Sequence, residues 1–211
     1  RRPPRSTPLY SSAASDVYKR QGLASGVDTP SSFFLMFLPE AENPGHLVLL
    51  FADCAVNVDP TPEQLADIAV SSAISYGKIV GTNPHIAMLS FSTLGSAKHP
   101  RVERVREAVA QVRTTHPTLI IDGELQADTA LIHTVAKTKL SDVGNVAGRD
   151  NVLIFPNLDA ANIGYKLTQH LASARAIGPI LQGFDRPISD LSRGATTNDI
   201  VTTARVLLTQ I

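Results

Sequence analysis

The chain has 211 residues, 43% of them hydrophobic and 18% charged, so it is not a disordered chain and can bury a core in one or two domains. Its 19 basic and 19 acidic residues cancel, which argues against a protein that binds nucleic acid through charge alone. One cysteine excludes an internal disulfide, and no apolar run approaches the roughly 20 residues of a membrane span. We therefore expect a soluble, cytoplasmic protein without a nucleic-acid or membrane partner.

Residues 1–21 differ in composition from everything that follows. Proline, serine and alanine dominate, no helix or strand periodicity appears, and the apolar segment of a secretory signal is missing. The stretch is rich in arginine and serine and poor in acids, which is also typical of a transit peptide. We favour a non-native translated leader that forms no part of the fold.

Beyond residue 21, apolar runs of strand length alternate with segments of helical periodicity. We predict strands at 31–38, 46–51, 85–91, 118–122 and 152–155, and a short strand within 178–181. We predict helices that begin at 61–62 and cover 99–113, 124–136, 159–174 and the C-terminus. The first two strands should pair across the turn at 39–45. The later alternation predicts a three-layer α/β fold whose sheet is largely parallel and covered on both faces.

Polar loops follow several of the predicted strands. Ligands of open α/β sheets bind beyond the carboxyl ends of the strands, where we place loops 52–57, 92–99, 122–128 and 156–162. Gly95 and Ser96 precede a helix and could offer backbone N–H groups to a phosphate, or form an ordinary helix start. Cys54 follows a strand, where a small buried hydrophobe is the plainer interpretation. The six histidines form no pair at helical spacing, so we predict no metal site.

The loop before the last helix combines a phosphate-binding side chain with a carboxylate. Ser192 adds a hydroxyl, and Arg193 adds a planar cation that can bind a phosphate through two hydrogen bonds. Asp199 lies in the first helical turn. This set suits acyl transfer from an acyl phosphate. Thr196 and Asp199 also match a helix-capping pattern, so a capping role for Asp199 and a surface position for Arg193 stay open.

Five stretches of the chain resemble one family in the same order. Residues 190–194 (DLSRG), preceded by IGPILQG at 177–183, resemble the C-terminal signature of phosphotransacetylase, or phosphate acetyltransferase. The other four stretches are FADCAVN at 51–57, MLSFSTLGSAKHP at 88–100, DGELQAD at 122–128, and residues 151–167. The resemblance runs from about residue 22 to the end of the chain.

The resemblance implies a fold of the isocitrate and isopropylmalate dehydrogenase kind. Enzymes of this family have two α/β domains with the active site between them, and usually form homodimers. By this comparison, residues 31–177 form the second domain, and 22–30 with 178–211 are remnants of the first. We therefore expect a chain that is truncated at its N-terminus and is inactive, or nearly so, by itself.

The resemblance also implies a reaction: reversible transfer of an acetyl group between acetyl phosphate and the thiol of coenzyme A, without a tightly bound cofactor. Arg193 would bind the phosphate, Ser192 would position the reacting groups, and Asp199 would take the proton from the thiol. The other substrate-binding residues implied are Gly95, Ser96, Cys54 and His170, the last in place of an arginine expected near the nucleotide part of coenzyme A. Phosphate butyryltransferase and a non-catalytic module that binds coenzyme A or an acyl phosphate are the alternatives.

Overall fold

The computed structural model describes residues 22–38, 47–144, 147–191 and 194–211, so the predicted leader at 1–21 lies outside it. Its strands are β1 (Ser31–Phe37), β2 (Val48–Ala52), β3 (His85–Leu89), β4 (Ile120–Leu125), β5 (Val152–Ile154), β6 (Arg175–Gln182) and β7 (Ile188–Ser189). Its helices are α2 (Pro62–Val80), α3 (Pro100–Thr115), α4 (Ala127–Leu131), α5 (His133–Lys139), α6 (Leu158–Leu171) and α7 (Thr197–Leu208). None of these helices is long and apolar enough to cross a membrane.

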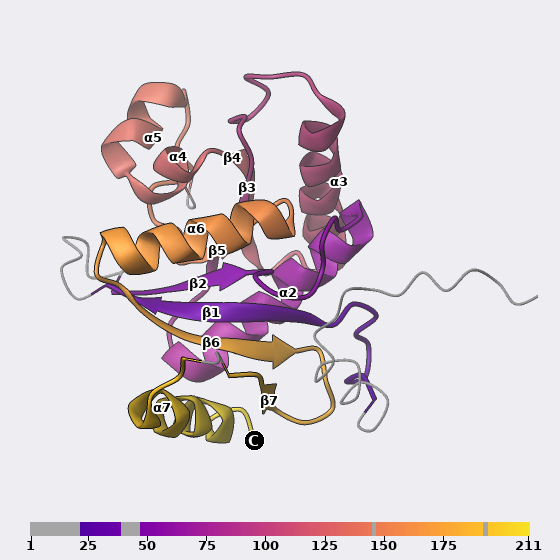
Figure 1. Ribbon diagram of the computed structural model, residues 1–211. Helices are drawn as coiled ribbons and strands as arrows, with labels where there is room; N and C mark the ends of the chain where they lie inside the picture. The colour runs from indigo at the N-terminus through magenta and orange to yellow at the C-terminus, as the bar shows by residue number, and fades with distance from the viewer. Residues whose placement is uncertain (1–21, 39–46, 145–146, 192–193) are drawn as a thin grey trace, which may run out of the picture.

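The strands form one mixed sheet in the order β4-β3-β5-β2-β1-β6-β7 (Figure 1). β2, β5, β3 and β4 run parallel, while β1 is antiparallel to both β2 and β6. The predicted pairing of the first two strands is confirmed. Because β1 reverses direction between its neighbours, β6 points the same way as β2. The strands from β2 to β6 therefore end at one side of the sheet, which we call its carboxyl end.

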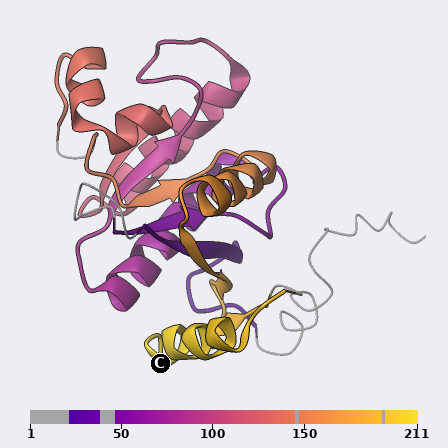
Figure 2. The same ribbon diagram turned by 60° about the vertical axis from the view of Figure 1, so that its left-hand side comes forward.

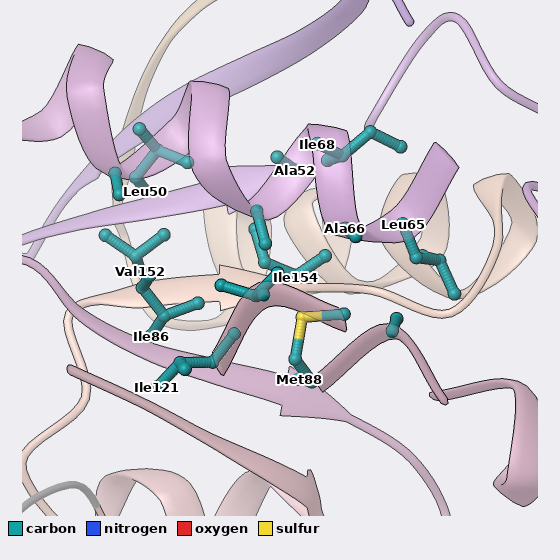
Figure 3. Close-up of a cluster of buried hydrophobic side chains, with 14 of the residues drawn as sticks. Leu50, Ala52, Leu65, Ala66, Ile68, Ile86, Met88, Ile121, Val152 and Ile154 are labelled. Atoms are coloured by element: carbon teal, nitrogen blue, oxygen red, sulfur yellow. The ribbon is translucent and has the colours of Figure 1, made fainter. Parts of the chain in front are cut away.

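Apolar side chains cover both faces of the sheet, as the alternation along β5 illustrates. Val152 and Ile154 pack toward α2 and α3 in the cluster of Figure 3, whereas Leu153 belongs to the cluster on the opposite face. On that second face Phe34 stacks on Tyr165 of α6, with ring centroids 4.3 Å apart. The predicted three-layer α/β architecture is confirmed.

The capping residues of α2 act as their chemistry dictates. The Thr61 side chain accepts a hydrogen bond from the Gln64 N–H, the Gln64 side chain accepts one from the Thr61 N–H, and Pro62 occupies the first turn. Gly81 ends the helix in the left-handed region, with φ of 76°. The predicted start of this helix at 61–62 is confirmed.

The predicted helix at 124–136 is wrong at its start and its middle. Residues Glu124 and Leu125 belong to β4, where both are fully buried, and the helix only begins at Ala127. Ile132 has an extended backbone (φ −112°, ψ 107°) and separates α4 from α5. Residues 124–125 stay in the sheet because β4 pairs with β3. That pairing cannot be inferred from the sequence around residues 124–125 alone.

The sheet continues without interruption across the predicted domain boundary. β6 pairs with β1 from Arg175 opposite Phe37 to Gln182 opposite Ser31, so the boundary between 177 and 178 falls inside a strand. Leu23 forms a bridge with Phe184. α7 lies beside β6 and β7, away from α4 and α5, in both views (Figures 1 and 2). The assignment of 22–30 and 178–211 to a first domain stays a prediction.

Candidate active site

The loops after β2, β3, β4 and β5 meet at the carboxyl end of the sheet. Hydrogen bonds join them: Phe155 N–H donates to the Ala52 carbonyl, at 2.6 Å, and Gln126 N–H donates to Thr93 Oγ1, at 3.1 Å. A cavity of about 340 Å³ at this end of the sheet is lined by residues from β3, α3, α4, α6 and the loops after β3 and β5: Leu89, Ser90, Phe91, Arg101, Ala127, Phe155, Pro156, Asn157 and Ala160. This is the position that ligands take in open α/β sheets.

A buried carboxylate organises the loop after β2. Asp53 is 3% exposed, and its two oxygens accept hydrogen bonds from the Ser32 N–H and hydroxyl, from the N–H groups of Ala55, Val56 and Asn57, and from the Asn57 side chain. Burial raises the pKa of the Asp53 carboxyl, and the hydrogen bonds from Ser32, Ala55 and Asn57 oppose that rise. Asp53 therefore holds the loop in one conformation.

Cys54 does not line the cavity. Its side chain is fully buried in the apolar cluster on the α6 face, and its thiol donates to the Phe51 carbonyl, with Sγ 3.3 Å from the oxygen. Burial, and the neighbouring Asp53 charge, raise the pKa of the Cys54 thiol well above its usual value. This geometry fits the packing interpretation better than a substrate-binding one.

We expect Cys54 to be unreactive toward a thiol reagent in the native protein, because a buried thiol with a raised pKa has almost no accessible thiolate. Titration with 5,5′-dithiobis(2-nitrobenzoate) should release less than a tenth of one equivalent of chromophore in minutes. The same sample should release one equivalent in guanidinium chloride. Rapid release of a full equivalent under native conditions would show that the loop after β2 opens.

A second buried carboxylate holds the loop after β3. Glu124 Oε1 accepts hydrogen bonds from the Gly95 N–H, at 2.7 Å, and from the Ser92 hydroxyl, at 2.8 Å. Ser96 N–H donates to the Thr93 carbonyl, at 3.1 Å. The two N–H groups that we expected to be available for a phosphate therefore already have protein acceptors. α3 begins later, at Pro100, so Gly95 and Ser96 form a turn ahead of the helix and not its first turn.

The loop before α7 lies at the other end of β6. Asp199 Oδ1 is 3.7 Å from Nη2 of Arg175, the first residue of β6. Cys54 comes just after the end of β2, where the last residue of β2 and Ile180 of β6 lie opposite the same residue of β1. Five residues of strand, or roughly 15 Å, separate these two positions along β6. The structure does not bring Asp199 together with Gly95, Ser96 or Cys54. Ser192 and Arg193 lie outside the described residues.

Asp199 caps α7. Its Oδ2 accepts hydrogen bonds from the Thr196 N–H and hydroxyl, and its own N–H donates to Thr196 Oγ1. The Thr196 hydrogen bonds, with a smaller contribution from Arg175, hold the pKa of the exposed Asp199 carboxyl below its usual value. Oδ1 takes no part in the cap and forms the ion pair with Arg175 Nη2.

His170 is exposed in the last turn of α6. Ala160, which lines the cavity, is ten residues earlier, or about 15 Å along the helix axis. His170 therefore does not reach the cavity at the carboxyl end of the sheet.

The cavity also contains residues that we did not predict from the sequence. Phe91 is 57% exposed, and Arg101 lies in the first turn of α3. A cation near a helix N-terminus is electrostatically unfavourable, so an arginine in the first turn of a predicted helix is a sequence feature that could have indicated a functional residue. The described residues hold no group of three or more histidine, cysteine, aspartate or glutamate side chains arranged for a metal ion.

Comparison with known proteins identifies the family. The sequence model of the phosphate acetyl/butaryl transferase family matches residues 9–208 of this chain, so the match begins inside the predicted leader. A phosphate acetyltransferase of Clostridium acetobutylicum is 50% identical over 187 residues, which are 89% of this chain and 56% of that protein. The crystal structure of a phosphotransacetylase from Streptococcus pyogenes has a TM-score of 0.85 and 42% identity, over 96% of this chain and 60% of that one.

A more distant likeness concerns the fold alone. The 4-hydroxythreonine-4-phosphate dehydrogenase of Klebsiella pneumoniae has a TM-score of 0.53 at 11% identity, over 84% of this chain and 53% of that one. It supports the predicted dehydrogenase-like fold. The chain spans about half the length of the curated relatives it matches. With nearly its whole length matched by the family model, the chain belongs to the phosphate acetyl/butaryl transferase family.

Proposed function

We propose that this chain forms part of an enzyme that transfers an acetyl group reversibly between acetyl phosphate and the thiol of coenzyme A. The observation that carries the proposal is the 50% identity with a phosphate acetyltransferase across 89% of the chain. Coenzyme A is a substrate in this proposal, and no tightly bound cofactor takes part. We further propose a cytoplasmic homodimer. The one cysteine, buried as a free thiol, is compatible with a reducing compartment.

Asp199 is the proposed acceptor of the thiol proton. Oδ1, the oxygen not used in the cap, would take the proton, and the thiolate would attack the acetyl carbon. The bond between that carbon and the bridging oxygen then breaks, and inorganic phosphate leaves. Arg193 would bind the phosphate, and Ser192 would position the reacting groups. A thiol of pKa about 8.5 is mostly protonated at neutral pH, so the reaction needs such an acceptor.

The lowered pKa of Asp199 has two opposite consequences for this role. The carboxyl is ionised throughout the neutral range and is therefore always ready to accept a proton. The same stabilisation makes it a weaker base than an ordinary aspartate. Exclusion of water by bound substrates would raise its basicity, because desolvation disfavours the charged form.

The proposed reaction can be tested on two proteins. One is this chain, and the other is a chimera in which residues 22–211 replace the matching part of the Clostridium acetobutylicum enzyme. Formation of acetyl-CoA from acetyl phosphate and coenzyme A is followed for both, with butyryl phosphate in parallel. We expect turnover by the chimera, faster with acetyl phosphate. No turnover by either protein, beside an active Clostridium enzyme, would overturn the proposal. Coenzyme A binding without turnover would indicate a binding module.

Arg193→Lys in the chimera should lower kcat/KM at least tenfold. Lysine keeps the charge but lacks the planar fork that binds two phosphate oxygens, and a charge-assisted hydrogen bond contributes about 1.5–3 kcal/mol. Arg205→Lys is the matched control, because Arg205 is an exposed arginine on α7. Unchanged kinetics in Arg193→Lys would remove Arg193 from the phosphate site.

A further inference from the structure

We propose that a second cavity, between α2 and the end of β6, binds a small dicarboxylate at a site separate from that of the proposed acetyl transfer. We call it the α2 cavity. Lys78 and Arg186 supply its two positive charges, and the side chains of Ser71 and Gln210 supply hydrogen bonds. The inference goes beyond the proposed function, because the dicarboxylate is an effector of the enzyme and not a substrate.

The α2 cavity lies away from the residues assigned to acetyl transfer. It has a volume of about 310 Å³ and is lined by residues within 24–27, 71–78 and 181–187, together with Gln210. Gln182, the last residue of β6, is part of its lining, whereas Asp199 lies beside Arg175 at the start of the same strand. Seven residues of strand, or roughly 23 Å, separate the two positions along β6. A small ligand in the α2 cavity therefore does not contact Asp199.

Hydrogen-bonded polar side chains form one wall of the α2 cavity. Gln182 is only 4% exposed, and its Nε2 donates to the hydroxyls of Ser31 and Ser72, both at 2.9 Å. Its Oε1 accepts a hydrogen bond from Ser75 Oγ, at 2.9 Å. Because these bonds connect β6 with β1 and α2, the wall keeps its shape before a ligand binds. A fixed polar wall favours a ligand that carries polar groups.

Two further donors of the α2 cavity have no partner within the part of the chain that the structure describes. The side-chain Nε2 of Gln210 is buried and forms no hydrogen bond with any described residue. Ser71 is 8% exposed, and its hydroxyl likewise forms no hydrogen bond with residues of the described ranges. A buried donor without an acceptor costs free energy, and the oxygens of a carboxylate are acceptors only. A bound carboxylate would therefore satisfy these donors.

The charge of the α2 cavity is positive. Lys78, in the last turn of α2, and Arg186, in the turn after β6, are exposed, and their side chains form no ion pair or hydrogen bond with any described residue. Asp185 is the one acid among the described lining residues, and it pairs with neither cation. Because different elements present the two cations, they suit a ligand with an anionic group at each end. Arginine can bind one carboxylate through two hydrogen bonds, and lysine can bind the other.

Calorimetric titration of the 211-residue chain tests the proposal with three probes: succinate, butyrate and inorganic phosphate. Butyrate has the same number of carbons as succinate but a single carboxylate, and phosphate carries its charge on one group. We expect succinate to bind at least tenfold more tightly than either, because a charge-assisted hydrogen bond contributes a factor of about ten or more to affinity. Coenzyme A added in excess should not displace succinate, since the two would occupy different sites.

Variants of the two cations test the charge. In Lys78→Gln and in Arg186→Gln, succinate should bind no more tightly than butyrate, because one of its carboxylates then has no cation to bind. Lys137→Gln is the matched control: it removes an exposed cation of α5 that lies outside the cavity lining, and succinate should bind it as it binds the unchanged chain. Because Lys78 and Arg186 are exposed, their variants should unfold at the wild-type temperature.

Several results would overturn the proposal. They are no binding of succinate, binding of butyrate or phosphate as tight as that of succinate, and unchanged affinity for succinate in both Lys78→Gln and Arg186→Gln. Displacement of succinate by coenzyme A would overturn it as well, because the α2 cavity would then belong to the substrate site.

The chimera gives the proposed function a separate readout. Saturating succinate should change its kcat or its KM at least twofold, and Arg186→Gln in the chimera should abolish that change. Turnover that succinate leaves unaltered would reject the effector and keep the acetyltransferase activity. Absence of turnover, beside cation-dependent binding of succinate, would reject that activity and keep the binding site.

Discussion

Replacing Asp150 by asparagine is expected to stabilise the protein near neutral pH and to flatten the dependence of its stability on pH. Asp150 is fully buried in the loop before β5, and neither carboxyl oxygen forms a hydrogen bond with the described residues. Burial, and the negative charge of Asp122, raise the pKa of Asp150 to about 9. The native state therefore holds a proton on this group that the unfolded chain releases above pH 4.

The sign of the effect follows from proton binding. Between about pH 4 and pH 9 the native state binds more protons than the unfolded state, so the free energy of unfolding falls as pH rises. Each pH unit in that window weakens folding by about 1.4 kcal/mol, so the loss at pH 7 reaches about 4 kcal/mol. Asparagine cannot ionise and loses nothing across the window. Below pH 4 the two proteins should be nearly equal in stability.

Urea unfolding of wild type and Asp150→Asn, at intervals from pH 4 to pH 9, measures the difference directly. The gap between the two free energies should widen steadily with pH. Asp185→Asn is the matched control, because Asp185 is exposed, and it should track wild type throughout. A constant gap between wild type and Asp150→Asn would mean that Asp150 does not take up a proton on folding.

Local signals in the sequence were enough for most elements of the fold. Thr61, Pro62 and the apolar stripe behind them specify the start of α2 through contacts within one turn, and Thr196 with Asp199 specifies that of α7 in the same way. The alternation of strands and helices predicts a sheet covered by helices on both faces, and the central strands β2, β3 and β5 are indeed buried on both faces.

What sequence reasoning missed depends on distant partners. Glu124 extends a strand because it is buried against the loop after β3, and its hydrogen bond to Gly95 spans 29 residues. β6 extends to Arg175 because it pairs with β1, more than 130 residues away. Asp150 occurs in a stretch with the composition of a surface loop, yet it is fully buried and its N–H donates to the carbonyl of Ala130 in α4. A neighbour remote in the chain leaves no local periodicity.

The same limit applies to the candidate site. The polar loops at the carboxyl end of the sheet could be located, because their position follows from strand direction alone. The sequence could not show which polar groups of these loops are free to bind a ligand. Glu124 accepts a hydrogen bond from the Gly95 N–H, and Ser92 accepts one from the Ala97 N–H. The residues left open to a ligand, Phe91 and Arg101, are those that the network does not use.

Asp53→Ala should destabilise the protein by at least about 4 kcal/mol, because it leaves six hydrogen-bond donors without their acceptor: four in the loop after β2 and two on Ser32 of β1. An unsatisfied buried donor costs about 1–3 kcal/mol, and alanine is too small to shield the site from water. A loss of this size in a chain of this length lowers the melting temperature by roughly 10 °C.

Asp53→Asn separates the loss of acceptors from the loss of volume. It keeps the shape and one acceptor oxygen but turns an NH₂ group toward the N–H donors that Asp53 satisfies, so its stability should lie between those of Asp53→Ala and wild type. Asp59→Ala is the control: this side chain is 70% exposed and pairs with Arg104 on the surface, so its loss should cost less than about 1 kcal/mol. Thermal melts followed by circular dichroism would rank the three variants. Equal melting temperatures for Asp53→Ala and Asp59→Ala would show that water replaces the carboxylate, and that Asp53 does not hold the loop.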